Sequence, residues 1–177
     1  MQNWKSDIKN WEKITPEKAK FAFELSAKRL ESTIKIKDAL DDKAFKLITI
    51  LIPIQTTVIT LLITLIHNNK LDLSILIPLL NFILLGFISI CYSISIFKPK
   101  NFYLPGNQPD NLWKDELLKQ DEEFIIFNES CNHQDYIYHN DKYNNLSVIA
   151  LNNSTKAFLF ALILSLILYF ILKCLMS

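Results

Sequence analysis

Hydrophobic residues in this chain are concentrated in three long runs that contain no charged side chain. They cover residues 47–66, 73–97 and 157–172, and Lys173 follows the third run directly. A bilayer core about 30 Å thick is crossed by about 20 helical residues, so the first two runs are long enough to span it. Residues 174–176 extend the third run, because a lysine side chain can snorkel to the interface. The pattern predicts three transmembrane helices; buried core helices are the alternative, but the polar remainder is too short to cover them.

A further helix is predicted to begin well ahead of the first run. Thr15, Pro16 and Glu17 combine a capping hydroxyl, a proline at the first helical position and an acid in the first turn. Apolar residues then recur at 4-3-4 spacing, at Phe23, Ala27, Leu30 and Ile34. Neither glycine nor proline follows before Pro53. We expect one helix to run unbroken into the first span, with a narrow apolar seam that needs a partner helix.

The second polar segment, residues 98–156, is the expected partner. Residues 97–113 contain three prolines and one glycine, which is typical of an ordered turn. A helix is predicted over 115–131, and the positions Leu146, Ile149 and Asn153 indicate another that leads into the third span. At the start of the chain, helical spacing predicts an amphipathic segment that lies in the membrane interface or packs on the neighbouring helices. Its residues are Trp4, Ile8, Trp11 and Ile14.

The predicted fold class is an all-α membrane protein with three transmembrane helices. The N-terminal helix and the 98–156 segment are expected to form a cytoplasmic helical bundle. The predicted organisation is 1–46 as cytoplasmic amphipathic helices, 47–97 as a transmembrane hairpin, 98–156 as cytoplasmic loop and helices, and 157–177 as the third transmembrane helix.

Charge sets the expected orientation. Residues 1–46 hold eleven lysines and arginines and residues 98–156 hold six, whereas Lys70 and Lys173 are the two on the other side. This positive-inside asymmetry predicts that the N-terminus and the 98–156 segment are cytoplasmic, with the C-terminus outside. The same two segments carry net charges of +3 and −3, so they are expected to dock on each other.

Composition narrows the classes of function. The 177 residues are 50% hydrophobic and include two glycines, so a glycine-rich nucleotide-binding turn is excluded. Gly86 lies within a span, where close helix packing favours it, and Gly106 lies in the proline-rich turn. A net charge of +1 gives no nucleic-acid signal. We expect no enzyme and no cofactor, because no nucleophile–base order and no P-loop is found.

One cluster superficially resembles a metal site. Its members are Cys131, His133, Asp135, His139 and Asp141. The spacings C-x-H and H-x₅-H match zinc sites poorly, so a solvated polar helix is the preferred interpretation and no metal is predicted.

Polar side chains inside the spans are more informative. Hydroxyl and amide residues recur at helical spacing in the first two spans, and we assign them to a pore or oligomer face: Thr56, Thr60, Thr64, Asn81, Ser89 and Ser93. Such residues let membrane helices pack closely and bond across the contact. In an oligomer the same residues could line a water-filled path. Both interpretations stay open.

The segment 22–52 resembles the corresponding part of small bacterial anti-phage membrane effectors of the Pycsar-effector and SLATT types. The matching positions are Phe23, Glu24, Arg29, Leu30, Asp41, Lys43 and Ala44. The segment 97–113 is similar to the loop that follows the second span in such proteins, and Asn153 and Lys156 are similar to the end of the helix before the final span. The resemblance covers most of the chain and is shared by both types of effector.

The resemblance implies a homo-oligomeric effector in the bacterial inner membrane that impairs this membrane on receiving an upstream signal, which could be a nucleotide second messenger. An anionic messenger would bind a basic face of the N-terminal helix, made of Lys18, Lys20, Lys28, Arg29, Lys35 and Lys37. The alternative is a membrane-anchored adaptor or sensor that recruits a soluble partner through residues 98–156. A phage holin is less favoured, because the cytoplasmic segments are longer than a simple hole-former needs. The lipid bilayer is a partner in each case.

Overall fold

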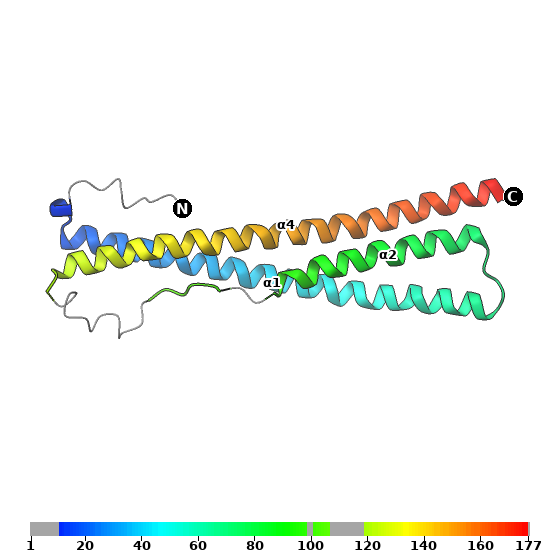
Figure 1. The fold of residues 1–177 in the computed structure, drawn as a ribbon, viewed down its shortest axis with the longest axis horizontal. Coiled ribbons are helices and arrows are strands. Elements are labelled where there is room, and N and C mark those ends of the chain that lie inside the picture. The colour runs from blue at the N-terminus through cyan, green and yellow to red at the C-terminus, as the bar shows by residue number, and fades with distance from the viewer. Residues whose placement is uncertain (1–10, 99–100, 107–118, 177) are drawn as a thin grey trace. The chain divides into compact units, whose positions relative to one another are not determined.

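The computed structural model describes residues 11–98, 101–106 and 119–176, and all regular elements within these ranges are helical. They are η2 (Trp11–Lys13), α1 (Pro16–His67), α2 (Leu73–Ile96) and α4 (Glu122–Met176) (Figure 1). The three α-helices are long and apolar enough to cross a membrane. The all-α class and the three apolar spans are therefore confirmed for the described residues.

The first long helix begins where its capping residues predict. The Thr15 carbonyl accepts the Ala19 N–H at 2.9 Å, and the Thr15 hydroxyl lies 3.4 Å from the Lys18 N–H. α1 then continues for 52 residues, with Pro53 inside it. The expectation of one helix that runs unbroken into the first span is confirmed.

The last long helix differs from its prediction. Residues 115–118 lie outside the described residues, but 119–121 are not helical, so α4 begins at Glu122. The Asp121 carbonyl accepts hydrogen bonds from the N–H groups of Phe124 and Ile125, at 3.0 and 3.2 Å. The acidic residues at 122 and 123 interact favourably with the positive end of the helix dipole. From there α4 runs 55 residues without a glycine or proline, so the segment rich in asparagine and tyrosine is helical as well.

The chain divides into two compact units. The polar unit comprises residues 1–37 and 100–144, and the apolar unit comprises residues 38–99 and 145–177. The division falls between residues 37 and 38 of α1 and between residues 144 and 145 of α4. Both positions come before the apolar runs that begin at residues 47 and 157. The predicted amphipathic segment over residues 4–14 lies largely outside the described residues.

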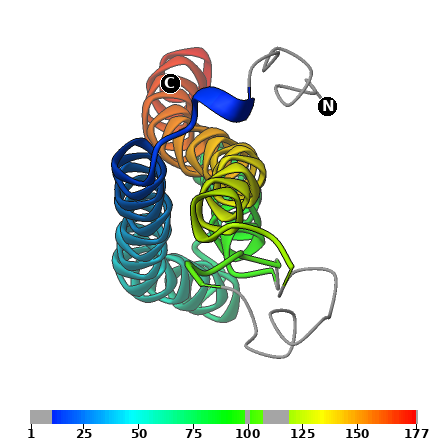
Figure 2. The same cartoon turned by 90° about the vertical axis from the view of Figure 1, so that its left-hand side faces the viewer.

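In the polar unit, the first part of α1 lies beside the first part of α4 (Figure 1 and Figure 2). Ala19 and Leu30 of α1 and Cys131 and Ile137 of α4 are buried there. The α1 seam departs from its prediction by one position. Thr33 is fully buried, whereas the expected seam residues Ala27 and Ile34 are half-buried.

In the apolar unit, α2 packs against both α1 and α4. Gln55 of α1 is buried and its Nε2 donates to the Phe82 carbonyl of α2 at 3.4 Å. A Cβ at Gly86 would overlap the Gln55 amide group. Gly86 therefore permits the close approach of α1 and α2, which confirms the packing role predicted for this glycine.

A tight turn joins α1 to α2. Asn69 has a φ of 53°, in the left-handed region. The N–H of Asn69 donates to the Ile66 carbonyl and the N–H of Lys70 to the Leu65 carbonyl, each at 3.1 Å. This is the Schellman arrangement, with asparagine in the position that glycine usually takes. It explains how the hairpin closes in a chain so poor in glycine.

Candidate functional site

The polar residues predicted to form one membrane face are divided by the structure. Thr56, Thr60 and Thr64 are exposed on α1. Each threonine hydroxyl donates to the carbonyl four residues earlier, at 2.8–2.9 Å. Their hydrogen-bonding needs are thus met within the helix. The three side chains form a ridge of small residues on an otherwise apolar helix, which we call the threonine face.

The other three residues of the predicted face turn toward α4 instead. Asn81 Nδ2 donates to Ser165 Oγ at 2.9 Å. Ser89 and Ser93 are fully buried, and their hydroxyl oxygens lie 2.9 and 2.7 Å from Ser154 Oγ. These residues hold α2 against α4 within one chain. The six positions therefore do not make a single exposed face, and the threonine face is the part of them that is exposed.

The residues predicted to form a basic face are also divided. Arg29 pairs with Asp141 of α4 at 3.1 Å, and Lys37 lies 5.7 Å from the centre of the Phe102 ring. Lys18 Nζ donates to the Lys13 carbonyl. Lys20, Lys28 and Lys35 are exposed. At 3.6 residues per turn the six positions point around the helix in different directions, so they do not converge on one ligand.

Asn140 makes several hydrogen bonds to other parts of the polar unit. Its side chain is fully buried and joins three parts of the chain. The Asn140 Oδ1 accepts the Tyr103 N–H at 3.1 Å, while Nδ2 donates to the Tyr103 carbonyl and to Thr33 Oγ1, each at 2.9 Å. The Tyr103 ring stacks on Tyr136 with 4.5 Å between ring centres. The Asn140 side chain thus binds Tyr103, in residues 101–104, to α4. The same side chain also binds α4 to α1 through Thr33.

Sequence reasoning missed this set of contacts. The buried polar positions of α4 are spaced by three, four or seven residues, so they fall on one coiled-coil-like seam, which also contains buried Ile137. They are Ser130, His133, Asn140, Asn144 and Ser147, and the same spacing reaches Ser154. The repeat was present in the sequence. It was overlooked because seam positions are ordinarily sought among apolar residues.

His133 lies in the same seam and faces α1. The imidazole is fully buried, with Nδ1 2.9 Å from Ser26 Oγ and the ring 5.2 Å from that of Phe23. Its Nε2 lies 3.7 Å from Glu129 Oε1. Serine, histidine and glutamate stand in the order of a hydrolytic relay. The imidazole is fully buried, and in this conformation it joins Ser26 of α1 to Glu129 of α4.

Burial lowers the pKa of His133 below the ordinary value of 6.5, opposed in part by the Glu129 carboxylate, which favours the charged ring. The unfolded chain therefore takes up this proton at a higher pH than the folded chain. The stabilisation from the neutral ring is complete above about pH 6.5 and is lost as the pH falls toward the lower folded value. The slope for one proton cannot exceed about 1.4 kcal/mol per pH unit.

We expect the polar unit to be less stable at about pH 5.5 than at about pH 7.5. Hydrogen exchange of the α4 segment 122–144 measures this in the detergent-solubilised chain. His133→Gln should remove this part of the pH dependence, whereas His67→Gln, at the exposed end of α1, should preserve it. An identical pH dependence in the wild type and His133→Gln would contradict the assignment.

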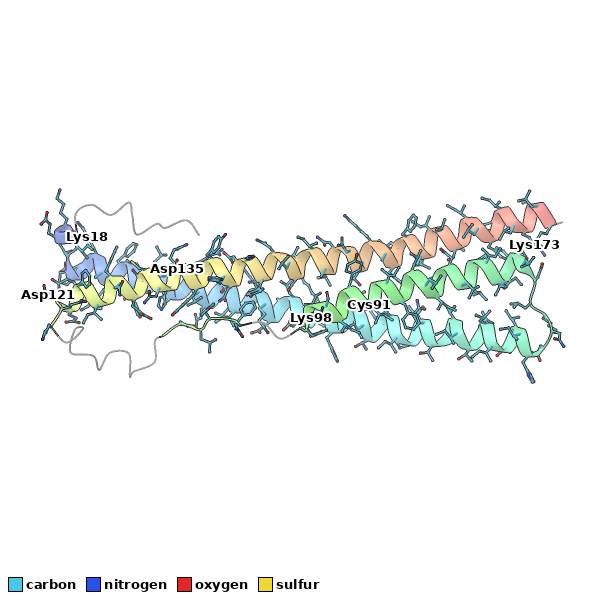
Figure 3. All side chains as sticks on the ribbon, viewed as in Figure 1. Lys18, Cys91, Lys98, Asp121, Asp135 and Lys173 are labelled. Atoms are coloured by element: carbon cyan, nitrogen blue, oxygen red, sulfur yellow. The ribbon has the colours of Figure 1, made fainter. Side chains whose placement is uncertain are left out.

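The superficial metal cluster does not assemble. Within the described ranges, no group of three or more histidine, cysteine, aspartate or glutamate side chains is placed to hold a metal ion. Cys131 and His133 are buried in the helix seam, whereas Asp135 is exposed on α4 (Figure 3). The polar unit is thus organised by hydrogen bonds between helices.

Comparison with protein-family models, with curated proteins and with solved structures finds no match to this chain.

Proposed function

We propose that this protein is a membrane effector of bacterial anti-phage defence that self-associates and impairs the inner membrane. It would cross the membrane three times, with the N-terminus and the polar unit in the cytoplasm. The seventeen lysines and arginines of residues 1–46 and 98–156 support this orientation. The family resemblance of residues 22–52 supports the defence role.

The observation that carries the proposal is the exposed threonine face of α1. Large apolar side chains flank it, including Ile63 and Ile66, each about half exposed. Small residues at such spacing allow the backbones of two membrane helices to approach closely. The threonine hydroxyls can also share their hydrogen bonds with a neighbouring helix. The face therefore supports association of several copies in the membrane, with hydroxyl groups along the contact.

The upstream signal would act on the polar unit. A nucleotide messenger or a soluble defence partner are the two kinds of signal that we propose. The exposed cations Lys20, Lys28 and Lys35 could receive an anionic messenger, although the six predicted basic residues point around α1 in different directions. We therefore place the messenger site on the polar unit as a whole.

Growth and membrane potential in cells that express the chain test the proposal. We expect growth arrest and depolarisation in the wild type, reported by a potential-sensitive dye. Thr60→Leu should weaken association by about 1.4 kcal/mol, which is tenfold, because bulk on the threonine face separates the helices. Leu61→Phe adds bulk to a different exposed face and serves as the matched control. Absence of arrest and depolarisation, with and without the cognate signal, would refute the proposal.

A membrane-anchored adaptor is the second candidate function. Phe21 and Leu25 are 69% and 58% exposed, one turn apart on α1 in the polar unit. They lie outside the apolar runs, so an exposed apolar pair of this kind favours a protein partner. Phe21→Ser with Leu25→Ser should abolish co-purification of a soluble partner. If that variant loses the partner, while the wild type shows no membrane phenotype, the adaptor is supported over the effector.

A further inference from the structure

An open apolar groove lies in the apolar unit, between all three helices. Its volume is about 280 Å³. The buried residues Pro78 and Phe82 of α2 form its floor, and Val58 of α1 forms one wall. Leu166 and Tyr169 of α4 are exposed at its rim. The groove lies entirely within segments long and apolar enough to span a membrane.

The chemistry of the groove suits a hydrocarbon chain. Its lining is almost wholly apolar, and the Ser165 hydroxyl accepts from Asn81 Nδ2 at 2.9 Å. Water would therefore find few partners there. An apolar cavity of about 150 Å³ holds one benzene ring, so this groove has room for roughly ten chain carbons. An α-helix from a second copy, about 10 Å across, is too wide to enter it.

Polar groups follow the groove toward the C-terminal end of α4. The Tyr169 hydroxyl makes no hydrogen bond to the described residues, and tyrosine at a membrane interface ordinarily bonds to lipid headgroups. Lys173 lies one turn further along α4 and is exposed (Figure 3). The hydrogen bond from Ser74 lowers the pKa of the hairpin carboxyl Asp72, and the Lys173 cation lowers it further. A phenol and a cation thus follow the groove toward the end of the last apolar segment.

We propose that the groove binds one acyl chain of a membrane phospholipid, with the lipid phosphate held by Tyr169 and Lys173. The chain fills the space between Val58, Phe82 and Leu166, where surrounding lipid is the abundant apolar ligand. The phosphate neutralises Lys173 and accepts a hydrogen bond from the Tyr169 hydroxyl. This inference is independent of the proposed function, because it requires neither association of copies nor membrane damage.

Native mass spectrometry of the full chain tests the proposal. The chain is extracted from vesicles of phosphatidylethanolamine and phosphatidylglycerol, and retained phospholipids are counted. We expect one phospholipid per wild-type chain. Val58→Phe fills the groove from its wall and should lower the retained fraction at least about fivefold. Leu162→Phe closes the groove from its partly exposed rim, so it gives the same loss with less strain on the fold.

Leu80→Phe is the matched control, because Leu80 is exposed on α2 and does not line the groove. It should retain lipid as the wild type does. Lys173→Gln and Tyr169→Phe should reduce retention of phosphatidylglycerol more than that of phosphatidylethanolamine. The proposal is overturned if the wild type carries no phospholipid, or if both groove-filling variants retain as much as the wild type. It is also overturned if those variants change only the number of associated copies, because the groove would then receive a side chain of a second copy.

Discussion

Ser154→Leu is expected to destabilise the apolar unit by about 2–4 kcal/mol. Ser154 is fully buried where α4 meets α2, and its hydroxyl donates to the Ser89 carbonyl at 2.7 Å. The Ser89 hydroxyl donates in return to the Ser154 carbonyl at 2.8 Å. Leucine removes hydrogen bonds worth about 0.6 kcal/mol each between membrane helices. It also inserts a larger side chain into a close contact, which costs about 1–3 kcal/mol.

Unfolding in mixed micelles, followed by circular dichroism, measures this effect. Tryptophan fluorescence does not, because Trp4, Trp11 and Trp113 all lie outside the apolar unit. Thr155→Leu is the matched control, since Thr155 is exposed and its hydroxyl bonds within α4 to the Leu151 carbonyl. Ser154→Ala should fall between the two, because it loses the hydrogen bonds without adding bulk. Equal stability of Ser154→Leu and Thr155→Leu would show that this contact does not hold the helices together.

Asn140→Leu is expected to free residues 101–104 from α4 and to destabilise the polar unit by about 2–4 kcal/mol. The substitution removes the partners of the Tyr103 N–H and carbonyl, and one partner of the Thr33 hydroxyl. Three hydrogen bonds are lost, and each contributes about 0.5–1.5 kcal/mol. The Thr33 hydroxyl keeps its bond to the Leu30 carbonyl at 2.7 Å, so most of the loss falls on the Tyr103 backbone.

Hydrogen exchange of a peptide that covers residues 101–106 reports this change directly. Each 1.4 kcal/mol is tenfold in the opening equilibrium, so exchange at Tyr103 should accelerate by at least about tenfold. Gln134→Leu makes the same kind of replacement at an exposed position of α4 and should leave exchange unchanged. If the Tyr103 N–H of Asn140→Leu exchanged as slowly as that of this control, residues 101–104 would be held on α4 by the Tyr103–Tyr136 stack instead.

Opposite net charge was expected to dock the two polar segments, and the structure assigns the main role to other contacts. Arg29 and Asp141 do pair, but both side chains are at least one-third exposed, and such pairs contribute about 0–1 kcal/mol. The buried contacts of Asn140, Asn144 and His133 contribute more, because each leaves polar groups without partners when it is removed. Net charge is a sum over all residues of a segment, whereas docking depends on the few residues that are in contact between the two helices.

The predicted seam of α1 shows the same limit. Apolar spacing indicated Ala27 and Ile34, but Ser26 and Thr33 face α4, because His133 and Asn140 offer them hydrogen bonds. A polar residue at a seam position can specify helix register, at a cost in stability. The sequence predicted the spacing of the seam residues and some of the residues themselves, such as Leu30. The side that faces the partner depended on residues about a hundred positions away.

The sequence by itself determined the properties that arise within one helix. Three uncharged runs and the cap at Thr15 were sufficient to predict three helices long and apolar enough to span a membrane, and the start and continuity of α1. Tertiary structure alone decided that Ser89 and Ser93 bond to Ser154, and that Asn140 joins α1, α4 and residues 101–104. The physical reason is that hydrophobic periodicity and capping act between near neighbours in the chain. Hydrogen bonds between helices depend instead on which partner a fold brings within 3 Å.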